Sequence, residues 1–398
     1  MVIKNDPTLM FTNAGMNQFK DIFLGNQAPS HNRVANSQKC LRVSGKHNDL
    51  EEVGLDTYHH TMFEMLGNWS FGDYFKKEAI EWAWEFLNGK LKIPQDRIYT
   101  TIFSGSPEEN VPRDEEAYSY WERCFPSESG RILEGSKKDN FWEMGESGPC
   151  GPCSEVHFDR GEGYCDKQDV PEHVCQVNGD CPRFLELWNN VFIQYNRLSP
   201  TELEPLPATH VDTGMGFERL VAVLQDVNSN YRTDLLWPLI EATQRLTGHT
   251  DEEREANFTP YRVIADHTRA ASFLIADGVV PGNTGRNYVC RMIIRRAARF
   301  GTKIGLREPF LATVAEEVIR IYGDFYPELV RHRSAILDSP TREVRRFART
   351  VEAGQAQLEQ SLEKLKRGGG ALLSGEEAFE LYATYGLPLE ITRDIARE

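Results

Sequence analysis

Short apolar runs, rich in aromatic and β-branched residues and bounded by Gly, Asn, Asp or Pro, dominate the first half of the chain. Such runs predict β-strands. They cover residues 9–12, 39–43, 61–65, 97–103 and 185–195. Between them, residues 76–91 repeat apolar side chains at the spacing of an amphipathic helix. Many strands with little regular strand–helix alternation predict an α+β fold, in which helices flank an antiparallel sheet.

The pattern changes near residue 230, after which helical periodicity replaces the strand runs. The predicted helices cover residues 233–246, 261–277, 288–301, 309–322 and 375–385. Apolar residues from Val344 to Leu365 fit one further long helix, which the glycines at 368–370 should end. We therefore predict two domains, a sheet-based one over residues 1–230 and an all-helical one over residues 231–398.

Composition narrows the class of protein. The 398 residues hold 40% hydrophobic side chains and no apolar run of the roughly 18 residues that a membrane span needs, so an integral membrane protein is excluded. Residues 1–7 lack the pattern of a signal peptide, and we expect a cytoplasmic protein. The 60 acidic against 45 basic residues argue against unspecific coating of nucleic acid, although a local basic surface stays open.

Five of the eight cysteines fall between residues 150 and 181, in a chain too long to be a disulfide scaffold. With His157 and His173 nearby, these thiols could hold a structural zinc ion. The candidate ligands are Cys150, Cys153, Cys165, Cys175 and Cys181. Only the Cys150–Cys153 pair has a standard short ligand spacing, and buried thiols in a reducing cytoplasm are the simpler interpretation.

Common nucleotide-binding loops are absent from the sequence, but three other segments carry polar chemistry. In the first, residues 38–68 read as strand, polar loop and strand, which can hold Arg42, Lys46 and His47 over a phosphate chain. The planar fork of an arginine suits two phosphate oxygens. A single arginine on a strand is more often only a solvated side chain, so the neighbouring segments must carry the interpretation.

The second segment, residues 141–155, has two Gly-Pro steps within four residues and predicts a rigid, tightly turned loop. The third, residues 210–220, places Gly214 and Gly216 before a helix that should present Arg219 from its first turn. Glycines there would let a ligand approach the backbone. Each segment alone could be an ordinary turn or strand-to-helix connection.

Together the three segments resemble the motifs of class II aminoacyl-tRNA synthetases, and among them the alanyl-tRNA synthetase family. The matching stretches are residues 5–20, 45–51, 59–74, 148–155, 212–219, 265–269 and 275–279. Pro7 is similar to the proline that closes motif 1, the loop after Arg42 to motif 2, and residues 214–219 to motif 3. The resemblance covers nearly the whole chain and implies an antiparallel sheet followed by a helical tRNA-recognition domain.

The resemblance implies an ATP-dependent alanine–tRNA ligase that uses Mg²⁺, forms alanyl-adenylate and transfers alanine to tRNA(Ala). Arg42, Asp212 and Arg219 would then be catalytic, with Arg42 on the α-phosphate and the alanine carboxylate, and Arg219 on the far end of the triphosphate. The other implied ATP contacts are Lys46, His47, Glu51, Phe63, Met65, Gly214 and Gly216, with Glu155 as a further helper. The alanine pocket would comprise Trp142, Asn189, Val211, Asp212 and Gly214, with Asp212 as the partner of the ammonium group.

The helical half has a basic run in which seven basic residues and no acidic one lie between Arg286 and Arg307. Arg291, Arg295 and Arg299 share one helix face, and this stripe favours contact with RNA phosphates over a merely solvated face. The resemblance further implies that Asn283 and Glu390 read a G·U pair in the acceptor stem, although the family usually has Asp at the second position. The expected tRNA contacts are Asn283, Arg286, Arg291, Arg295 and Glu390.

No segment resembles the family's editing domain, and the chain starts close to motif 1 and stops where family members continue. We therefore expect a truncated catalytic fragment with its editing and C-terminal domains absent. Two alternatives stay open, a synthetase-like RNA-binding or regulatory module without ligase activity and a zinc-dependent structural module. The pattern leaves the oligomeric state open.

Overall fold

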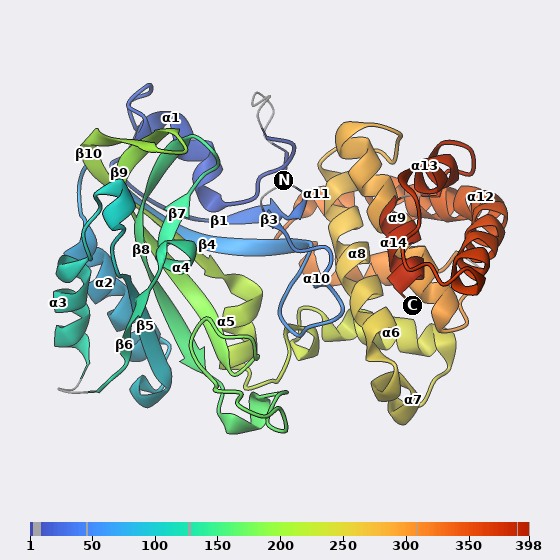
Figure 1. Cartoon of the computed structure of the whole chain (residues 1–398), viewed down its shortest axis with the longest axis horizontal. Coiled ribbons are helices and arrows are strands. Elements are labelled where there is room, and N and C mark those ends of the chain that lie inside the picture. Colours follow the sequence, from blue (N-terminus) through green and yellow to red (C-terminus); the bar gives the residue numbers. More distant parts are fainter. Residues whose placement is uncertain (3–8, 45–46, 126–128, 308, 388, 398) are drawn as a thin grey trace. The chain divides into compact units, whose positions relative to one another are not determined.

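The computed structural model describes residues 1–2, 9–44, 47–125, 129–307, 309–387 and 389–397 (Figure 1). Pro7 and Lys46 therefore lie outside the described residues. Contacts divide the chain into two units. The sheet unit comprises Ile3–Asn48 and Phe63–Thr233, and the helical unit comprises Met1–Val2, Asp49–Met62 and Asp234–Glu398. The main division thus follows Thr233, and residues 49–62 join the helices although they precede most of the strands.

The sheet unit contains an eight-stranded sheet within the described residues, with strand order β1-β4-β10-β9-β8-β5-β6 and β7 paired to β8. The strands are β1 (Arg33–Leu41), β4 (Met62–Phe71), β5 (Ile98–Phe103), β6 (Ile132–Gly135), β7 (Phe141–Glu143), β8 (Gly148–Asp159), β9 (Phe184–Ser199) and β10 (Glu202–Gly216). The β4–β10, β10–β9, β9–β8 and β8–β5 pairs are antiparallel, whereas β5–β6 is parallel. The predicted α+β class is confirmed. A short ribbon of β2 (Val43–Ser44) and β3 (His47–Asn48) follows Arg42.

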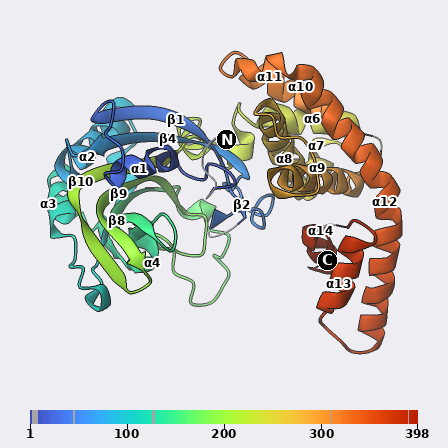
Figure 2. The same cartoon turned by 90° about the horizontal axis from the view of Figure 1, so that it is seen from above.

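Helices lie against both faces of this sheet. On one face, the 3₁₀ segment η1 (Gly15–Phe19) and α1 (Lys20–Phe23) place Met16 and Phe23 in a core with Trp69 and Ile193 (Figure 2). On the other, Trp121 donates its indole N–H to the Ser154 hydroxyl of β8 at 2.7 Å. The remaining helices are α2 (Lys76–Trp84), the π-helical η2 (Glu85–Lys90), α3 (Glu115–Cys124), α4 (Lys137–Asn140) and α5 (Phe217–Leu224), with 3₁₀ turns at Gln95–Arg97, Pro107–Glu109, Glu162–Tyr164 and Asn230–Arg232.

Two local predictions are wrong. Residues 148–152 do not form a tight loop but begin β8, because its neighbour β9 approaches so closely that a Cβ on Gly151 would lie 1.9 Å from the carbonyl oxygen of Phe192. Glycine thus permits the strand pairing instead of breaking it. Residues 9–12 form no strand; Phe11 is buried and Thr12 accepts one hydrogen bond from the Leu41 amide, so this apolar run covers the end of β1.

The helical unit is built from α6 (Trp237–Thr247), α7 (Asp251–Ala256), α8 (Phe258–Ala276), α9 (Gly285–Lys303), α10 (Leu311–Tyr322), α11 (Pro327–Arg331), α12 (Arg333–Arg367), α13 (Gly375–Ala383) and α14 (Leu389–Arg397). The six helices predicted here are confirmed, and α7, α11 and α14 add to them. The long helix α12 packs along α8, α9 and α10 (Figure 2). No helix in the described part of the chain has the length and apolarity to cross a membrane.

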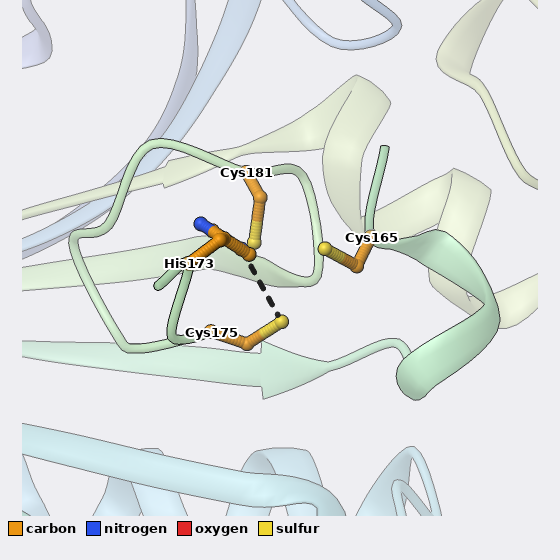
Figure 3. Close-up of side chains that lie close together, drawn as sticks. All are labelled: Cys165, His173, Cys175 and Cys181. Atoms are coloured by element: carbon orange, nitrogen blue, oxygen red, sulfur yellow. Dashed lines mark hydrogen bonds between the residues drawn. The ribbon is translucent and has the colours of Figure 1, made fainter. Parts of the chain in front are cut away.

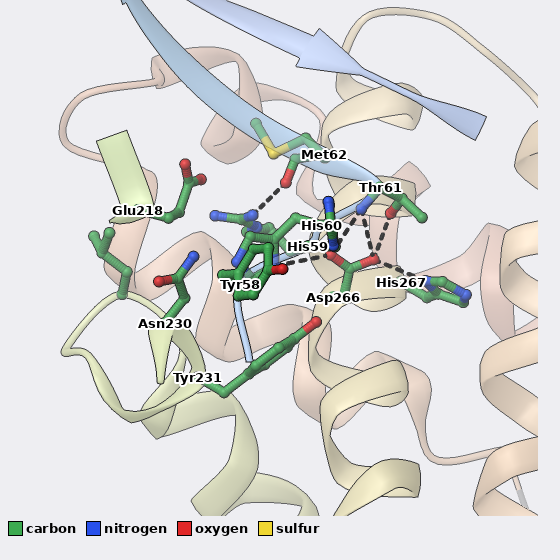
Figure 4. A network of polar contacts seen from close by, with 12 residues as sticks. Tyr58, His59, His60, Thr61, Met62, Glu218, Asn230, Tyr231, Asp266 and His267 are labelled. Carbon is green, nitrogen blue, oxygen red and sulfur yellow. Dashed lines mark hydrogen bonds and ion pairs between the residues drawn. The ribbon is translucent and has the colours of Figure 1, made fainter. Parts of the chain in front are cut away.

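The stretch at 265–269 anchors residues 60–62 to α8 (Figure 4). The fully buried Asp266 accepts hydrogen bonds from the Thr61 amide at 3.0 Å and the Thr61 hydroxyl, and it contacts His60 Nδ1 at 3.2 Å and His267 Nδ1 at 2.9 Å. Burial opposes ionisation of this carboxyl, yet the hydrogen bonds from His267 and His60 hold the pKa of Asp266 well below its usual range. The stretch is therefore a structural clamp within the helical unit.

Candidate active site

Most of the predicted ligand-binding residues of the sheet unit share one face of the sheet. Side chains alternate along a strand, so Asp212, Gly214 and Gly216 of β10 face the same side. In the β10–β9 register Asn189 pairs with Gly214, and in the β10–β4 register Met65 pairs with Gly216. The topology thus brings these positions together from the consecutive strands β9 and β10 and from β4, which is distant from them in the sequence.

Asp212 is the buried carboxyl group of this face. It is 6% exposed, and the indole N–H of Trp69 donates a hydrogen bond to its Oδ1 at 2.5 Å. Burial raises the pKa of Asp212 to about 7, although the bond from Trp69 acts in the opposite direction. A buried carboxyl with so little support favours the arrival of a cation, which would stabilise its ionised form. Sequence reasoning did not single out Trp69, although it lies within the matching stretch 59–74.

Two further predicted pocket residues are Asn189, which pairs in register with Gly214, and Trp142. The side-chain oxygen of Asn189 is buried and has no hydrogen-bond partner among the described residues, which marks it as an acceptor awaiting a donor. Trp142 of β7 packs against the core that contains Trp69. Val211 is completely buried, and alternation turns its side chain to the other face, so only its backbone could meet a ligand on the Asp212 side.

Glycines at the centre of this face allow the Met65 and Trp69 side chains to pack directly on the backbone. A Cβ on Gly214 would lie 2.7 Å from the sulfur of Met65, and one on Gly67 would lie 2.4 Å from the Trp69 ring and 2.8 Å from the carbonyl oxygen of Thr213. The Gly15 amide contacts the same Met65 sulfur at 3.4 Å. The Met65 side chain therefore lies between the backbones of η1 and β10, and the Trp69 ring packs on Gly67, so glycine at these positions leaves room for both side chains.

Arg42 leaves β1 where the strand ends and is held from two sides. Its Nε donates to the carbonyl oxygen of Asn13 at 3.0 Å, and its guanidinium lies 5.0 Å from the centre of the Phe63 ring. This cation–π contact and the hydrogen bond fix the plane of the group. The backbone of His47 is in β3, but its side chain, like all of Lys46, is outside the described residues.

Arg219 lies in the first turn of α5, as predicted. Its guanidinium donates to the backbone carbonyl of Glu186 at 2.9 Å and pairs with the Glu186 carboxylate at 3.3 Å. The next residue towards the N-terminus, the buried Glu218, accepts the backbone N–H of Glu64 at 3.2 Å and so ties α5 to β4. The roles of Glu186 and Glu218 have no signal in the sequence pattern, because their partners are far away along the chain.

The two glutamates expected as helpers are already bonded. Glu155 of β8 contacts Nε2 of His157 at 3.0 Å and accepts from Asn178 at 2.8 Å, and burial raises its pKa. Glu51 belongs to the helical unit, where it pairs with Arg393 at 2.6 Å and Arg397 at 3.1 Å. The oxygens of both carboxylates are therefore already engaged by protein side chains, which leaves them poorly placed to bind a magnesium ion.

The expected basic stripe on α9 is not a solvent-exposed face. Arg291, Arg295 and Arg299 are 8%, 6% and 5% exposed. The buried Glu343 of α12 lies 3.1 Å from Arg291 Nε and accepts a hydrogen bond from Arg295 Nε at 2.8 Å. The three arginines therefore form no exposed stripe, because a carboxylate on another helix draws these guanidinium groups inward. Their contact with RNA phosphates stays a prediction.

Asn283 and Glu390, expected in the acceptor-stem interface, are described to different extents. Asn283 is exposed before α9, and Arg291 donates a hydrogen bond to its side-chain oxygen. Arg286 is half-buried one residue into α9. Glu390 lies in α14, but its side chain is outside the described residues.

The five cysteines of the 150–181 region separate into two groups. Cys150 packs with Phe103 and Phe141, whereas Cys153 packs in the core of Trp69. Burial raises the pKa of both thiols, that of Cys150 to about 12. These two candidate ligands are therefore buried core thiols that lie outside the Cys/His cluster. Cys165, His173, Cys175 and Cys181 instead converge in the β8–β9 connection (Figure 3).

Comparison with known proteins agrees with the motifs. The family model of tRNA synthetases class II (A) matches residues 1–398. The chain is 53% identical over 403 residues to the alanine–tRNA ligase of Bacteroides fragilis and 52% identical over 399 residues to that of Cytophaga hutchinsonii. Both matches cover 100% of this chain, which itself spans 45% of the length of these relatives.

Among solved structures, apo histidyl-tRNA synthetase of S. aureus aligns with 53% of this chain and 49% of its own, at 11% identity and a TM-score of 0.28. That likeness is too weak to support an inference. The family assignment rests on the model that matches the whole chain and on the residues that converge around Asp212. The chain belongs to the class II (A) family of tRNA synthetases.

Proposed function

We propose that the chain activates alanine with ATP to alanyl-adenylate and transfers the alanyl group to the 3′ end of tRNA(Ala). The observation that carries this proposal is the buried carboxyl of Asp212, whose pKa burial raises to about 7, on the same sheet face as the unpaired oxygen of Asn189. Such a pair of acceptors suits a small ligand with an ammonium group. The alanine–tRNA ligases among its relatives support the choice of alanine.

Alanine is held through its charged groups, because its single methyl offers little surface. The Asp212 carboxylate pairs with the ammonium, and Asn189 Oδ1 accepts a second ammonium hydrogen. Trp142 closes the pocket beside the methyl group. Binding of the ammonium stabilises ionised Asp212, which reverses the effect of burial on this carboxyl.

In the first step an oxygen of the alanine carboxylate attacks the α-phosphorus of ATP, an O–P bond forms, and the bond to the β-phosphate breaks to release pyrophosphate. Two anions must meet in line, so placement and positive charge supply most of the acceleration. Arg42 is suited to bridge the α-phosphate and the carboxylate because Asn13 and Phe63 already fix its guanidinium plane. Arg219 binds the far phosphates in place of its Glu186 contact.

Magnesium would neutralise charge on the triphosphate when bound. The two acidic candidates, Glu51 and Glu155, are engaged by other side chains. The donors therefore fit an ion held chiefly by phosphate oxygens and water, which is the coordination that Mg²⁺ usually keeps. On the protein side, Arg42 and Arg219 supply the fixed positive charge that faces the triphosphate.

In the second step the terminal ribose hydroxyl of the tRNA attacks the activated carbonyl and AMP leaves. We assign recognition of the acceptor-stem G·U pair to Asn283 and Glu390, with Arg286 as a phosphate contact. The buried Arg291 and Arg295 then act indirectly: Arg291 holds the oxygen of Asn283, and Arg295 donates to the carbonyl oxygen of Gly386 at 2.9 Å. Gly386 precedes α14, which carries Glu390.

Alanine-dependent exchange of pyrophosphate into ATP tests the first step. Arg42→Ala and Asp212→Ala should each lower exchange by at least about 10³-fold, since both groups act on reacting charges. Arg33→Ala is the matched control, because Arg33 lies at the opposite end of β1 from Arg42, is exposed and pairs with Asp73. A chain that binds RNA yet performs no exchange would instead support a regulatory module without ligase activity.

Charging of short acceptor minihelices tests the second step. A minihelix with G·U should be charged at least about tenfold faster than one with G·C, since a mismatched contact of this kind costs about 1–3 kcal/mol. Asn283→Ala should remove most of this difference while pyrophosphate exchange stays unchanged. Equal charging of both minihelices by the parent chain would exclude the roles given to Asn283 and Glu390.

A further inference from the structure

The connection between β8 and β9, residues 160–183, is unusually long for a segment whose one regular element among the described residues is the turn Glu162–Tyr164. We infer that this connection folds around a structural zinc ion bound by Cys165, His173, Cys175 and Cys181. The inference does not depend on the proposed ligase activity. It replaces the ligand set expected from spacing, because Cys150 and Cys153 are buried in apolar cores elsewhere.

The geometry fits a tetrahedral site. The four ligand atoms all lie within 4.8 Å of one another, and their side chains point towards a common centre (Figure 3). Nε2 of His173 and Sγ of Cys175 are 3.6 Å apart. With Zn–S near 2.3 Å and Zn–N near 2.1 Å, tetrahedral ligands should be separated by about 3.6 Å for N and S and about 3.8 Å for two sulfurs.

The surroundings of the ligands supply a second, independent indication. Nδ1 of His173 lies 3.3 Å from Asp180, so a carboxylate can orient the imidazole with Nε2 towards the centre. Lys167 bonds the same Asp180 at 2.6 Å, and its backbone N–H donates to Sγ of Cys165 at 3.4 Å. Carboxylate–histidine pairs and N–H···S bonds are the kind of outer contacts that support metal ligands.

The chemistry is that of ligand exchange. Zinc binding replaces three S–H bonds with three Zn–S bonds and releases three protons, while His173 binds as a neutral ligand. Three thiolates and an imidazole complete the coordination, so the ion has no open position for a substrate and acts structurally. Zinc has no redox change, so the site needs no oxidant or reductant.

The zinc-bound connection would also support the active-site face. Asn178, between Cys175 and Cys181, donates to Glu155 of β8, which pairs in register with Asn189. The ends of the connection are joined by Arg183 and Asp159, at 2.8 and 2.9 Å. Loss of zinc should therefore loosen the connection and disturb the position of Glu155. The position of Asp212 on β10 should stay unchanged.

Metal analysis of the 398-residue chain, purified under reducing conditions and supplied with zinc, tests the site. We expect on the order of one zinc per chain in the parent protein and in Cys124→Ser, a half-buried thiol on α3 outside the cluster. Cys165→Ser, Cys175→Ser and Cys181→Ser should each lose most of the metal. Cobalt in place of zinc should show thiolate charge-transfer bands in the parent protein that Cys175→Ser abolishes.

A measurement on the parent chain covers the possibility that the serine variants fail to fold. Removal of zinc with a chelator should release the metal with proton uptake and expose Lys167 to trypsin, whereas added zinc should restore protection. A folded parent chain that takes up no zinc overturns the inference. So does zinc that Cys175→Ser and Cys181→Ser retain, or a Lys167 cleavage rate that zinc does not change. None of these readouts requires ligase activity.

Discussion

The role proposed for Asp212 in alanine binding would come at the expense of the stability of the fold. Its carboxyl is buried with a single described hydrogen bond, from Trp69, and burial raises its pKa to about 7. Only the ionised form can pair with an ammonium group. The KM for alanine should therefore rise as the pH falls through about 7, by about tenfold for each pH unit well below the pKa.

Pyrophosphate exchange at saturating ATP across this range measures the effect. An adenylate analogue with a propionyl group in place of alanyl lacks the ammonium, so its affinity should show no such step. The same step for both ligands would assign the titration to a group other than Asp212.

The same ionisation predicts a stability change in Asp212→Asn. In the unfolded chain this carboxyl titrates near 3.8, and in the folded chain near 7. Between these values the folded state binds more protons, so stability falls as the pH rises. The amide keeps the acceptor for Trp69 and removes the buried charge. Asp212→Asn should therefore be more stable than the parent at pH 8, by up to about 4 kcal/mol, and inactive.

Urea unfolding at pH 8 and at pH 4 measures this difference, which should nearly vanish at the lower pH. Asp73→Asn is the matched control, because Asp73 is partly exposed and paired with Arg33, and it should give no gain. Lower stability of Asp212→Asn at pH 8 would show that the carboxylate is better supported than the structure indicates.

At the scale of elements, the spacing of β4 and β10 depends on Gly67. An added Cβ would meet the Trp69 ring at 2.4 Å and the Thr213 carbonyl at 2.8 Å, and the second contact is with backbone that cannot move aside. Gly67→Ala should push Trp69 away from Asp212, raise the KM for alanine at least about tenfold and destabilise the fold by about 1–3 kcal/mol.

Gly163→Ala serves as the control, since nothing lies within 4 Å of a Cβ at that position. Exchange kinetics and thermal unfolding of both variants give the comparison. An unchanged KM in Gly67→Ala would mean that Trp69 does not position Asp212.

Sequence periodicity located the elements that are regular over many residues, and it missed those that depend on a neighbour. α8, α9 and α10 begin and end within three residues of their predicted bounds, because each repeats a buried stripe over several turns. β8 was hidden by its Gly-Pro steps, which usually mark turns, and only the close approach of β9 makes them part of a strand. β10 was hidden because its first half is largely exposed and contains Pro205 and Pro207, which are not typical of strands.

Motif resemblance placed Asp212, Asn189 and Arg219 in one site, but it could not reveal what holds them. Nothing in the sequence marks Trp69 as a partner of Asp212 or Glu186 as a partner of Arg219, because these contacts form only when the sheet is assembled. The burial of Arg291, Arg295 and Arg299 could not be foreseen from the basic run on α9, since charge counting cannot reveal a carboxylate on another helix. Ligand spacing also failed to identify the proposed zinc ligands, since it favoured the Cys150–Cys153 pair. The β8–β9 connection brings together Cys165, Cys175 and Cys181, which no short motif links.

At the scale of the whole molecule, the two units divide the proposed reaction. Arg42, Asp212 and Arg219 belong to the sheet unit, and Asn283 and Glu390 belong to the helical unit. Within the helical unit, Glu343 contacts both Arg291 and Arg295. Arg291 donates to the side chain of Asn283, and Arg295 donates to the carbonyl oxygen of Gly386, which precedes the helix that carries Glu390. Glu343 thus supports both residues proposed to recognise the G·U pair. Loss of its charge should release both guanidinium groups and leave activation of alanine untouched.

Glu343→Gln should therefore keep pyrophosphate exchange within about twofold and lower the kcat/KM for charging a G·U minihelix by about tenfold, equivalent to about 1.4 kcal/mol. The preference over a G·C minihelix should shrink, because Asn283 and the chain at Gly386 lose their supports. Glu317→Gln on α10 is the matched control, since Glu317 is a partly exposed carboxylate that pairs with Arg245 at 3.4 Å and with Arg320 at 2.7 Å. If exchange and charging fall together in Glu343→Gln, this carboxylate stabilises the fold and does not position the reading residues.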